Sequence, residues 1–514
     1  MEANQPISQF RKNPKVKIAS TLNAFNDYRT QPITYFRNES AKSDKLFSKI
    51  ISKNYQVLDS FCGYPSYLMM DNSDDFSYPH LKKIFQSLQN NNFIKWFSFR
   101  NVRFNDAPFF YMVDLAPSYP QGISDGKSKD SPIGHGFGKD SEEVFSKAIG
   151  EFLERYFLTL YHRKNLIRGS AKSFKKGVRM LDLRHLAGFS DKQKQPNPRI
   201  QFDEESFFYW EKAKRWLTGE TVYLPAQLIY WNYNQEELEP FLCEGNTSGA
   251  GGFFSLEKAI MVGLYELVQR DSFLIHWLNL LTPKKINPKT IPHNGFQDLL
   301  KESERYGFEI HCLNLTADTG IPVFAVVISD PSGENPRFCL GAGCQSDPCE
   351  ALYRAFEEAW SVYYWIRPRP PYPALDESYR PFKEGIDQDK RLRLWANPEM
   401  ARHFEFFISG KEESFTEIHF EYPKNFNSDK KELDFLVKKI EQCGHGYEVY
   451  YFQAKHPFLS DVGFYSVQVV VPQFVPLYLF EYDAPLGSSR LKGVPEKLGF
   501  KPRKEWNPLP HPFP

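Results

Sequence analysis

Apolar positions along the chain follow two spacings, one typical of buried strands and one typical of amphipathic helices. Short runs dominated by β-branched and aromatic residues predict strands at residues 109–115, 323–328 and 464–471. Apolar residues three and four positions apart predict long helices at residues 144–157, 256–273 and 349–364. Because strands and helices alternate along most of the chain, an α/β or α+β architecture is expected, and we assign the α+β class.

Three parts of the chain differ in composition and in the spacing of their apolar residues. Residues 1–100 are rich in Asn, Ser, Lys and aromatic side chains and contain a helical pattern at residues 78–89, so we interpret them as an N-terminal appendage. Residues 101–496 carry the alternating strands and helices and are predicted to form the main domain. Residues 497–514 lack regular apolar spacing and end in alternating prolines, which predicts an extended tail. Alternating Lys, Gln and Pro predict a flexible segment at residues 192–199.

One layout recurs three times along the main domain: a glycine-rich turn, a short polar linker and a helix. In each helix a small apolar residue precedes a glutamate by seven positions, which is close to two helical turns, so the two side chains share one face. The three pairs are Val144 and Glu151, Ala259 and Glu266, and Ala351 and Glu358. The three glutamates are therefore predicted to occupy equivalent places.

Two of these helices carry candidate chemistry. Glu151 and Glu154 lie one turn apart and can present two carboxylates to one point, a geometry suited to magnesium; a surface ion-pair helix is the alternative. Glu266 lies in a helix that is apolar over most of its circumference, so its charge needs a partner or a metal. Arg270, four residues later, is the local alternative.

The glycine-rich turns before these helices predict anion binding, because backbone N–H groups at a helix N-terminus can approach phosphate oxygens. Their spacing fits neither the Walker A loop nor the dinucleotide fingerprint, since no Ser or Thr follows Lys139 directly and the turn at residues 341–343 is too short. The pattern therefore favours a different kind of nucleotide site, in which acidic helices supply metal ligands.

Composition excludes several other classes. Sixty-four Lys and Arg balance 63 Asp and Glu, and no long basic stripe is present, which argues against nucleic-acid binding. Seven widely spread cysteines without a CxxC pair argue against disulfide frameworks and structural zinc. Residues 1–24 lack the apolar core of a signal peptide, and no run is long and apolar enough for a membrane span, so we expect a cytoplasmic protein.

Taken together, these residues resemble the YcaO family, and specifically its azoline-forming cyclodehydratases, over roughly residues 100–514. The matching segments are Gly138-Lys139 with Gly150-Glu151-Phe152-Leu153-Glu154-Arg155-Tyr156, Thr247-Ser248-Gly249-Ala250-Gly251-Gly252 with Glu257-Lys258-Ala259, Glu266-Leu267-Val268-Gln269-Arg270-Asp271, Ala351-Leu352-Tyr353-Arg354-Ala355 with Glu358, and the terminal Pro-x-Pro-x-Pro.

The resemblance implies a YcaO-type fold in which residues 101–496 form a catalytic domain, with a nonclassical ATP site between helices and a β-sheet. It implies that a Cys, Ser or Thr side chain of a ribosomally made precursor peptide attacks the preceding backbone amide. ATP phosphorylates the resulting hemiorthoamide oxygen, and the net result is dehydration to an azoline, as in thiazole- and oxazole-modified microcins. The expected cofactors are ATP and Mg²⁺.

Site roles carry over by resemblance, residue by residue. The implied metal ligands are Glu151, Glu154, Glu266 and Gln269. The implied nucleotide-binding residues are Lys139, Arg155, Ser248, Arg270 and Glu358. The implied catalytic residues of the tail, which would reach the active site, are Pro510, Pro512 and Pro514.

Four positions depart from the common pattern. Gln269 replaces a further glutamate, Lys258 an acidic residue, Phe254 a polar residue and Lys147 a serine. They keep a non-catalytic accessory role open, for instance beside a ribosomal-protein methylthiotransferase, and backbone thioamidation by the same activation is a second alternative. The family implies a precursor peptide and a separate leader-peptide-binding partner, ubiquitin-activating-like or a recognition-element protein, which the appendage could dock. It also suggests a homodimer, with no nucleic acid or membrane as partner.

Overall fold

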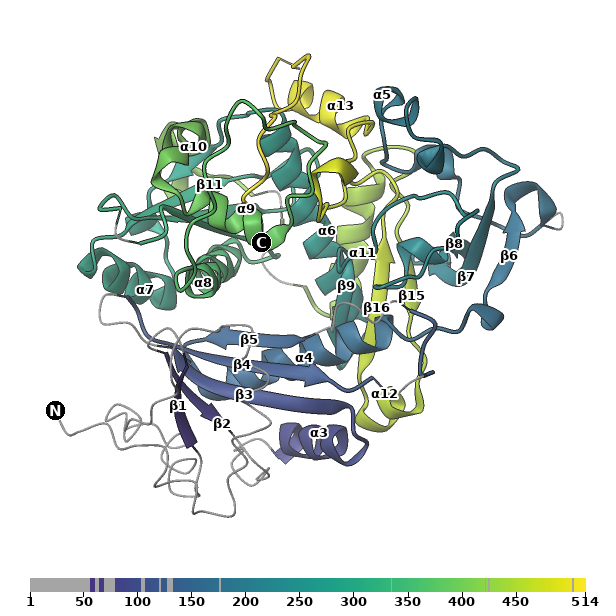
Figure 1. The fold of residues 1–514 in the computed structure, drawn as a ribbon, viewed down its shortest axis with the longest axis horizontal. Coiled ribbons are helices and arrows are strands. Elements are labelled where there is room, and N and C mark those ends of the chain that lie inside the picture. The colour runs from purple at the N-terminus through teal and green to yellow at the C-terminus, as the bar shows by residue number, and fades with distance from the viewer. Residues whose placement is uncertain are drawn as a thin grey trace. The chain divides into compact units, whose positions relative to one another are not determined.

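A computed structural model of the chain describes residues 56–60, 64–68, 79–102, 107–119, 122–126, 133–174, 177–333, 335–420, 422–423, 426–501 and 503–514 (Figure 1). The chain forms two compact units. The first unit comprises residues 1–123 and 130–156, and the second comprises residues 124–129 and 157–514. The sequence interpretation of residues 1–24 lies outside the described residues.

The first unit is an antiparallel sheet with two helices on one of its faces. Its strands, in sheet order, are β1 (Gln56–Ser60), β2 (Tyr64–Leu68), β3 (Ile94–Val102), β4 (Phe110–Pro117) and β5 (Gly134–Gly138), and its helices are α3 (Pro79–Asn90) and α4 (Ser141–Leu158). Phe97 and Phe99 are two residues apart on β3 and therefore point to the same face. The ring of Phe97 packs against Phe85 of α3 at 4.9 Å, and that of Phe99 against Phe145 of α4 at 5.2 Å.

The helix predicted at residues 78–89 is α3, offset by one residue. The boundary predicted between residues 100 and 101 falls inside β3, which pairs with β4 from Ile94 to Val102. The described end of the predicted appendage thus shares a sheet with the segment that follows it. A partner-docking role for residues 1–100 stays a prediction.

The second unit contains two sheets and most of the helices. The first sheet has the order β13 (Phe338–Cys344), β12 (Val323–Ser329), β11 (Glu309–Asn314), β10 (Lys284–Ile286), β14 (Glu412–Glu413). The second has the order β6 (Ile167–Ser170), β7 (Phe207–Arg215), β15 (Tyr450–Gln453), β16 (Tyr465–Val470), β9 (Ala250–Phe253), and β8 (Thr221–Pro225) pairs with β7. The helices are α5 (Asp191–Lys194), α6 (Leu256–Leu278), α7 (Asn294–Arg305), α8 (Pro348–Ile366), α9 (Gln388–Trp395), α10 (Ala401–Ile408), α11 (Asp429–Glu441), α12 (Pro457–Val462) and α13 (Arg490–Lys497).

Helix α6 is the centre of the second unit. It contacts β9 and β16 of one sheet and β12 and β13 of the other, and it contributes residues from Ala259 to Leu278 to the largest hydrophobic core. A helix that is apolar over most of its circumference can be buried in this way. The α+β class and the buried character of this helix, both expected from the sequence, are confirmed.

The segment predicted to be flexible, residues 192–199, is instead organised by local hydrogen bonds. Ser190 and Gln193 form a capping box at the start of α5, and Gln193 Nε2 donates to the carbonyl of Ala484 at 2.9 Å. Asn197 then caps a short 3₁₀ turn, Pro198–Ile200. Composition missed this segment because its order depends on caps and one long-range contact.

None of the helices that the structure describes combines the length and the hydropathy needed to cross a membrane.

Candidate active site

The three repeats seen in the sequence share one geometry. Each consists of a strand followed by a helix: β5 and α4, β9 and α6, and β13 and α8. In each, a backbone N–H at or just before the strand donates to the repeat glutamate. His135 donates to Glu151, Gly249 donates to Glu266 at 2.9 Å, and Ala342 donates to Glu358 at 2.6 Å. The predicted equivalence of the three glutamates is confirmed.

The glycines of the repeats lie largely in strands, which corrects the sequence interpretation of glycine-rich turns. Gly136, Gly251 and Gly343 belong to β5, β9 and β13. A Cβ on any of them would overlap the carbonyl oxygen of the small apolar residue eight positions later, which is Val144, Ala259 or Ala351. The missing side chains let strand and helix backbones touch, and this close approach brings each glutamate within reach of the strand N–H.

This close contact gives a matched pair of variants within the first unit. Gly136→Ala is expected to lower the free energy of unfolding by about 1–3 kcal/mol, because the new methyl group must push β5 away from α4. Gly150→Ala in α4 meets no neighbouring atom and is expected to add about 0.5–1 kcal/mol of helix stability. Chemical denaturation of both variants measures these changes in stability. An unfolding midpoint of Gly136→Ala equal to that of the parent protein would contradict the packing argument.

In the first unit, Glu151, Glu154 and Arg155 lie in the last turns of α4, whereas Lys139 precedes the first residue of this helix. Glu151 accepts the His135 N–H through one carboxylate oxygen and forms an ion pair with Arg155 through the other. Glu154 lies half-buried on the next turn. Arg155 Nη1 also donates to the carbonyl of Ile133 at 3.1 Å, and Lys139 Nζ lies 4.5 Å from the centre of the Phe110 ring.

The sequence interpretation missed a polar array on the face of this sheet opposite Phe97 and Phe99. Ser98, Asp114 and His135 are directly paired across β3, β4 and β5. Asp114 lies 2.7 Å from Nδ1 of His135 and accepts from Ser98 Oγ at 3.4 Å. Only the strand register brings them together, so no sequence spacing could have revealed them.

In the second unit, Arg270 connects the two halves of the second motif. Glu266 accepts from Gly249 through Oε2 and pairs with Arg270 Nη2 through Oε1 at 2.7 Å. Arg270 Nη1 donates to Ser248 Oγ at 2.6 Å, and Nη2 approaches Thr247 Oγ1 at 3.5 Å. Its Nε is buried and has no hydrogen-bond partner among the described residues. This nitrogen is therefore available to donate to an oxygen of a bound group.

Two of the unusual positions lie beside these residues. Gln269 is half-buried on α6, one turn after Glu266, and offers an amide oxygen where a glutamate would offer a charge. Lys258 is directed to Asp429 of α11 at 3.8 Å and lies 5.1 Å from the centre of the Phe253 ring. Part of the extra positive charge of Lys258 is therefore offset by Asp429.

The third repeat carries fewer charged side chains than the first two. Val362 stands where the first two repeats carry Arg155 and Arg270, and Ser361 stands where they carry Glu154 and Gln269. Glu358 keeps the hydrogen bond to the strand. We conclude that the module's geometry is retained three times, while its charged groups are concentrated in the first two copies.

The tail, residues 507–513, packs against the second unit. Indole Nε1 of Trp277 donates to the carbonyl of Leu509 at 3.2 Å, Trp395 Nε1 to that of Pro510 at 3.0 Å, and Tyr379 Oη to that of Pro508 at 2.9 Å. Phe513 enters the main core and lies 4.8 Å from Phe273, ring to ring. Pro510 and Pro512 are buried and Pro514 is half-buried.

The tail and the second motif thus share helix α6. Trp277 follows Glu266 by eleven residues, about three helical turns, so both lie on a similar side of the helix. His511 in the tail is close enough to Arg270 for the guanidinium to affect it: burial and then the charges of Arg391 and Arg270 hold the pKa of His511 well below its usual value. The spacing of eleven residues between Glu266 and Trp277 is the sequence signal by which Trp277 could have been found.

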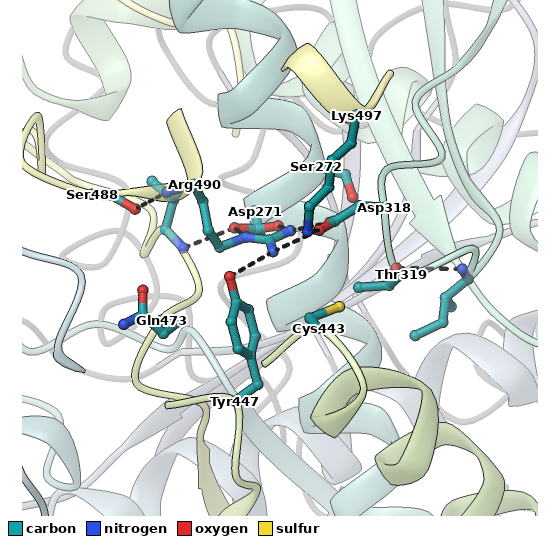
Figure 2. A network of polar contacts seen from close by, with 12 residues as sticks. Asp271, Ser272, Asp318, Thr319, Cys443, Tyr447, Gln473, Ser488, Arg490 and Lys497 are labelled. Carbon is teal, nitrogen blue, oxygen red and sulfur yellow. Dashed lines mark hydrogen bonds and ion pairs between the residues drawn. The ribbon is translucent and has the colours of Figure 1, made fainter. Parts of the chain in front are cut away.

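Asp271, next to Arg270, has a structural role (Figure 2). Arg490 of α13 donates to both its oxygens, at 2.8 and 2.6 Å, and also reaches Asp318 at 2.7 Å. Burial alone lowers the pKa of Arg490, but the two carboxylates outweigh burial and raise that pKa well above its usual range. The guanidinium therefore stays charged in the interior and joins α6 to α13.

The donor atoms of these residues fit magnesium and a nucleotide, and each unit contributes its own set. No group of three or more His, Cys, Asp and Glu side chains suited to a metal is found within the described ranges. Glu151 and Glu154 lie in the first unit, while Glu266 and Gln269 lie in the second. Carboxylate and amide oxygens are ligands that magnesium prefers, and the unsatisfied Nε of Arg270 suits a phosphate oxygen.

Curated relatives match parts of the chain. An uncharacterized protein of Methanothermobacter thermautotrophicus is 27% identical over 274 residues, which cover 52% of this chain and 66% of the relative. An uncharacterized protein in the tfuA 3′ region of Rhizobium leguminosarum bv. trifolii is 30% identical over 155 residues, 28% of this chain and 36% of the relative. The chain thus spans less than two thirds of either relative.

Solved structures share the fold. A heterocyclase in complex with substrate and cofactor matches 84% of this chain and 57% of its own, with a TM-score of 0.63 and 23% identity. The heterocyclase TruD matches 73% of this chain and 51% of its own (TM-score 0.57, 23% identity). YcaO from Methanopyrus kandleri, bound with AMPPCP and Mg²⁺, matches 79% and 92% (TM-score 0.56, 16% identity).

The family itself follows from the sequence model of the YcaO cyclodehydratases, described as ATP- and Mg²⁺-binding, which matches residues 135–475. This range contains all three repeats. The chain belongs to the YcaO family of ATP- and Mg²⁺-binding cyclodehydratases.

Proposed function

We propose that this protein uses magnesium ATP to activate a backbone amide of a ribosomally made precursor peptide, so that a Cys, Ser or Thr side chain closes onto it as an azoline. The observation that carries the proposal is the sharing of α6: Glu266 and Arg270 lie on the helix that also holds the tail through Trp277. Nucleotide-binding groups and the proline tail are therefore available to one reaction.

The repeat residues supply the charges that this reaction needs. We assign magnesium ligation to Glu151, Glu154, Glu266 and Gln269, and nucleotide binding to Lys139, Arg155, Ser248, Arg270 and Glu358. ATP supplies the phosphoryl group that turns the amide oxygen into a leaving group, and magnesium neutralises its phosphates. The hydrogen bonds of Glu266 do not exclude a metal, because a carboxylate oxygen accepts more than one bond.

The arginines have a second task in this proposal. Each pairs with its repeat glutamate, four residues earlier on the same helix. With the charge of the glutamate offset by a bound cation, the guanidinium would be available for bidentate contacts with phosphate oxygens, which are strong. Ser248, which accepts a hydrogen bond from Arg270, would help to hold that guanidinium in place.

Intact-mass analysis of the neighbouring precursor peptide tests the function. The peptide is incubated with this protein, a leader-binding partner and magnesium ATP, beside an ATP-free control. The expected result is the ATP-dependent loss of one water mass per modified residue. Exchange of oxygen for sulfur would instead support thioamidation, and no mass change with no nucleotide binding would support the accessory role.

The tail gives a further prediction. A Pro512→Ala/Pro514→Ala variant is expected to lower the rate of peptide modification about 10- to 100-fold, because a flexible end no longer holds groups in place. The variant is expected to keep its nucleotide affinity, measured by calorimetry, since the assigned nucleotide-binding residues are intact. Pro508→Ala is the control, because Pro508 is exposed and only its carbonyl is bonded, to Tyr379. Equal rates of peptide modification in the double variant and in Pro508→Ala would show that the terminal prolines take no part in the reaction.

A further inference from the structure

A cluster of buried polar side chains lies against the tail in the second unit. Arg391, Glu481 and His511 are fully buried, and Tyr478 is 3% exposed. Polar atoms of all four lack a hydrogen-bond partner among the described residues; these atoms are Arg391 Nε and Nη2, Tyr478 Oη, both carboxylate oxygens of Glu481, and His511 Nδ1. A buried polar atom without a partner is costly, so a concentration of such atoms indicates a place where a polar molecule can bind.

The four side chains face a common region. The rings of Tyr478 and His511 pack edge to face at 4.6 Å, and His511 Nε2 lies 3.2 Å from the Tyr478 carbonyl oxygen. Arg391 interacts electrostatically with Glu481, Tyr478 and His511, and its Nη1 donates to the carbonyl of Leu479. Burial raises the pKa of Glu481 to about 7, although Arg391 opposes the shift. Arg391 and Glu481 thus interact electrostatically but share no hydrogen bond.

The mixture of donors and acceptors identifies the occupant. Arg391 only donates and Tyr478 can donate and accept, while Glu481 only accepts when ionised and can do both when protonated. A cation would be repelled by Arg391, and an anion would be repelled by the ionised form of Glu481. Water satisfies both, because each molecule donates and accepts.

We propose that Arg391, Tyr478, Glu481 and His511 form a buried site for bound water molecules, and that this water fastens the tail to the second unit. His511 lies between Pro510 and Pro512, so the water would hold the middle of the proline series. Trp277, Trp395 and Tyr379 hold its carbonyl groups upstream. Arg391 and Glu481 are positioning residues in this scheme, and its catalytic consequence rests on the proposed function.

Tyr478→Phe tests the site, because it removes one hydroxyl and changes the shape little. If water is bonded to the hydroxyl, the variant loses a hydrogen bond, and amide hydrogen exchange at Leu509, His511 and Phe513 is expected to become about fivefold faster. If no water is bonded to the hydroxyl, its removal eliminates a buried polar group that lacks a partner, and amide hydrogen exchange in the tail stays equal or slows. The second result overturns the proposal.

Two controls frame this comparison. Tyr447→Phe removes a hydroxyl known to be bonded, to Arg490 Nη1 at 3.2 Å, and sets the thermal-midpoint decrease expected for a lost buried hydrogen bond. Tyr482→Phe removes an exposed side chain's hydroxyl and sets the baseline. Tyr478→Phe is expected to follow Tyr447→Phe; a midpoint at or above that of Tyr482→Phe contradicts bound water.

A second variant separates this inference from the proposed function. Arg391→Met is expected to speed exchange in the tail and to lower peptide modification, whereas Arg393→Met, on the same helix and paired with Asp389 at 3.0 Å, is expected to do neither. If the parent protein modifies no peptide, the proposed function fails while the exchange difference remains. Unchanged tail exchange in Arg391→Met would reject the water site whatever the activity.

Discussion

Glu266→Gln is expected to reduce ATP-dependent peptide modification by about 10²–10³-fold, more than the proline substitutions in the tail. Glutamine keeps the length of the side chain and an oxygen for the Gly249 N–H. It removes the negative charge that pairs with Arg270 and that would bind magnesium. The rate from intact-mass time courses and the affinity for magnesium nucleotide from calorimetry are the two measurements.

The control for this variant is Glu304→Gln, a surface carboxylate on α7 that pairs with Lys289 at 3.5 Å. It is expected to leave rate and affinity unchanged. Glu151→Gln is expected to match Glu266→Gln, because the two glutamates hold equivalent places in their repeats. If Glu266→Gln retains full activity, the ligand role assigned to the second motif is wrong.

Arg490→Met is expected to have the largest effect on stability, a loss of about 3–5 kcal/mol, because it leaves Asp271 and Asp318 buried without their main positive partner. Thermal unfolding followed by circular dichroism measures the loss. The transition to follow is that of the second unit, since all three residues belong to it.

Two further variants show whether charge burial is the cause. Lys497→Met removes a half-exposed partner of Asp318, 2.9 Å away, and is expected to cost less than about 1 kcal/mol. Asp271→Asn/Arg490→Met removes a buried negative charge together with the arginine and is expected to be more stable than Arg490→Met alone. A double variant that is less stable than the single one would point to lost packing as the main cause.

The sequence predicted those features that depend on local spacing. Strands at residues 323–328 and 464–471 correspond to β12 and β16, and the three repeat helices correspond to α4, α6 and α8. The equivalence of Glu151, Glu266 and Glu358 also followed from spacing, because seven residues fix two positions on one helical face.

Features that depend on pairing between distant segments could not be predicted. The glycine-rich segments look like turns in the sequence, and only their strand partners, such as β16 beside β9, show that they are strands. The Asp114–His135 contact requires the register of β4 and β5. Carbonyl groups of the tail are bonded by Trp395 and Tyr379, more than a hundred residues away, and backbone acceptors carry no sequence signature.

The contact of glycine with the helix backbone also determines which acid each repeat can use. Strand and helix are held at a fixed separation by the absence of a side chain at Gly136, Gly251 and Gly343. A carboxylate must cross that separation to reach the strand N–H, and the aspartate side chain is one methylene shorter than that of glutamate. The glycine therefore acts as a spacer that favours the side-chain length of glutamate at the paired position.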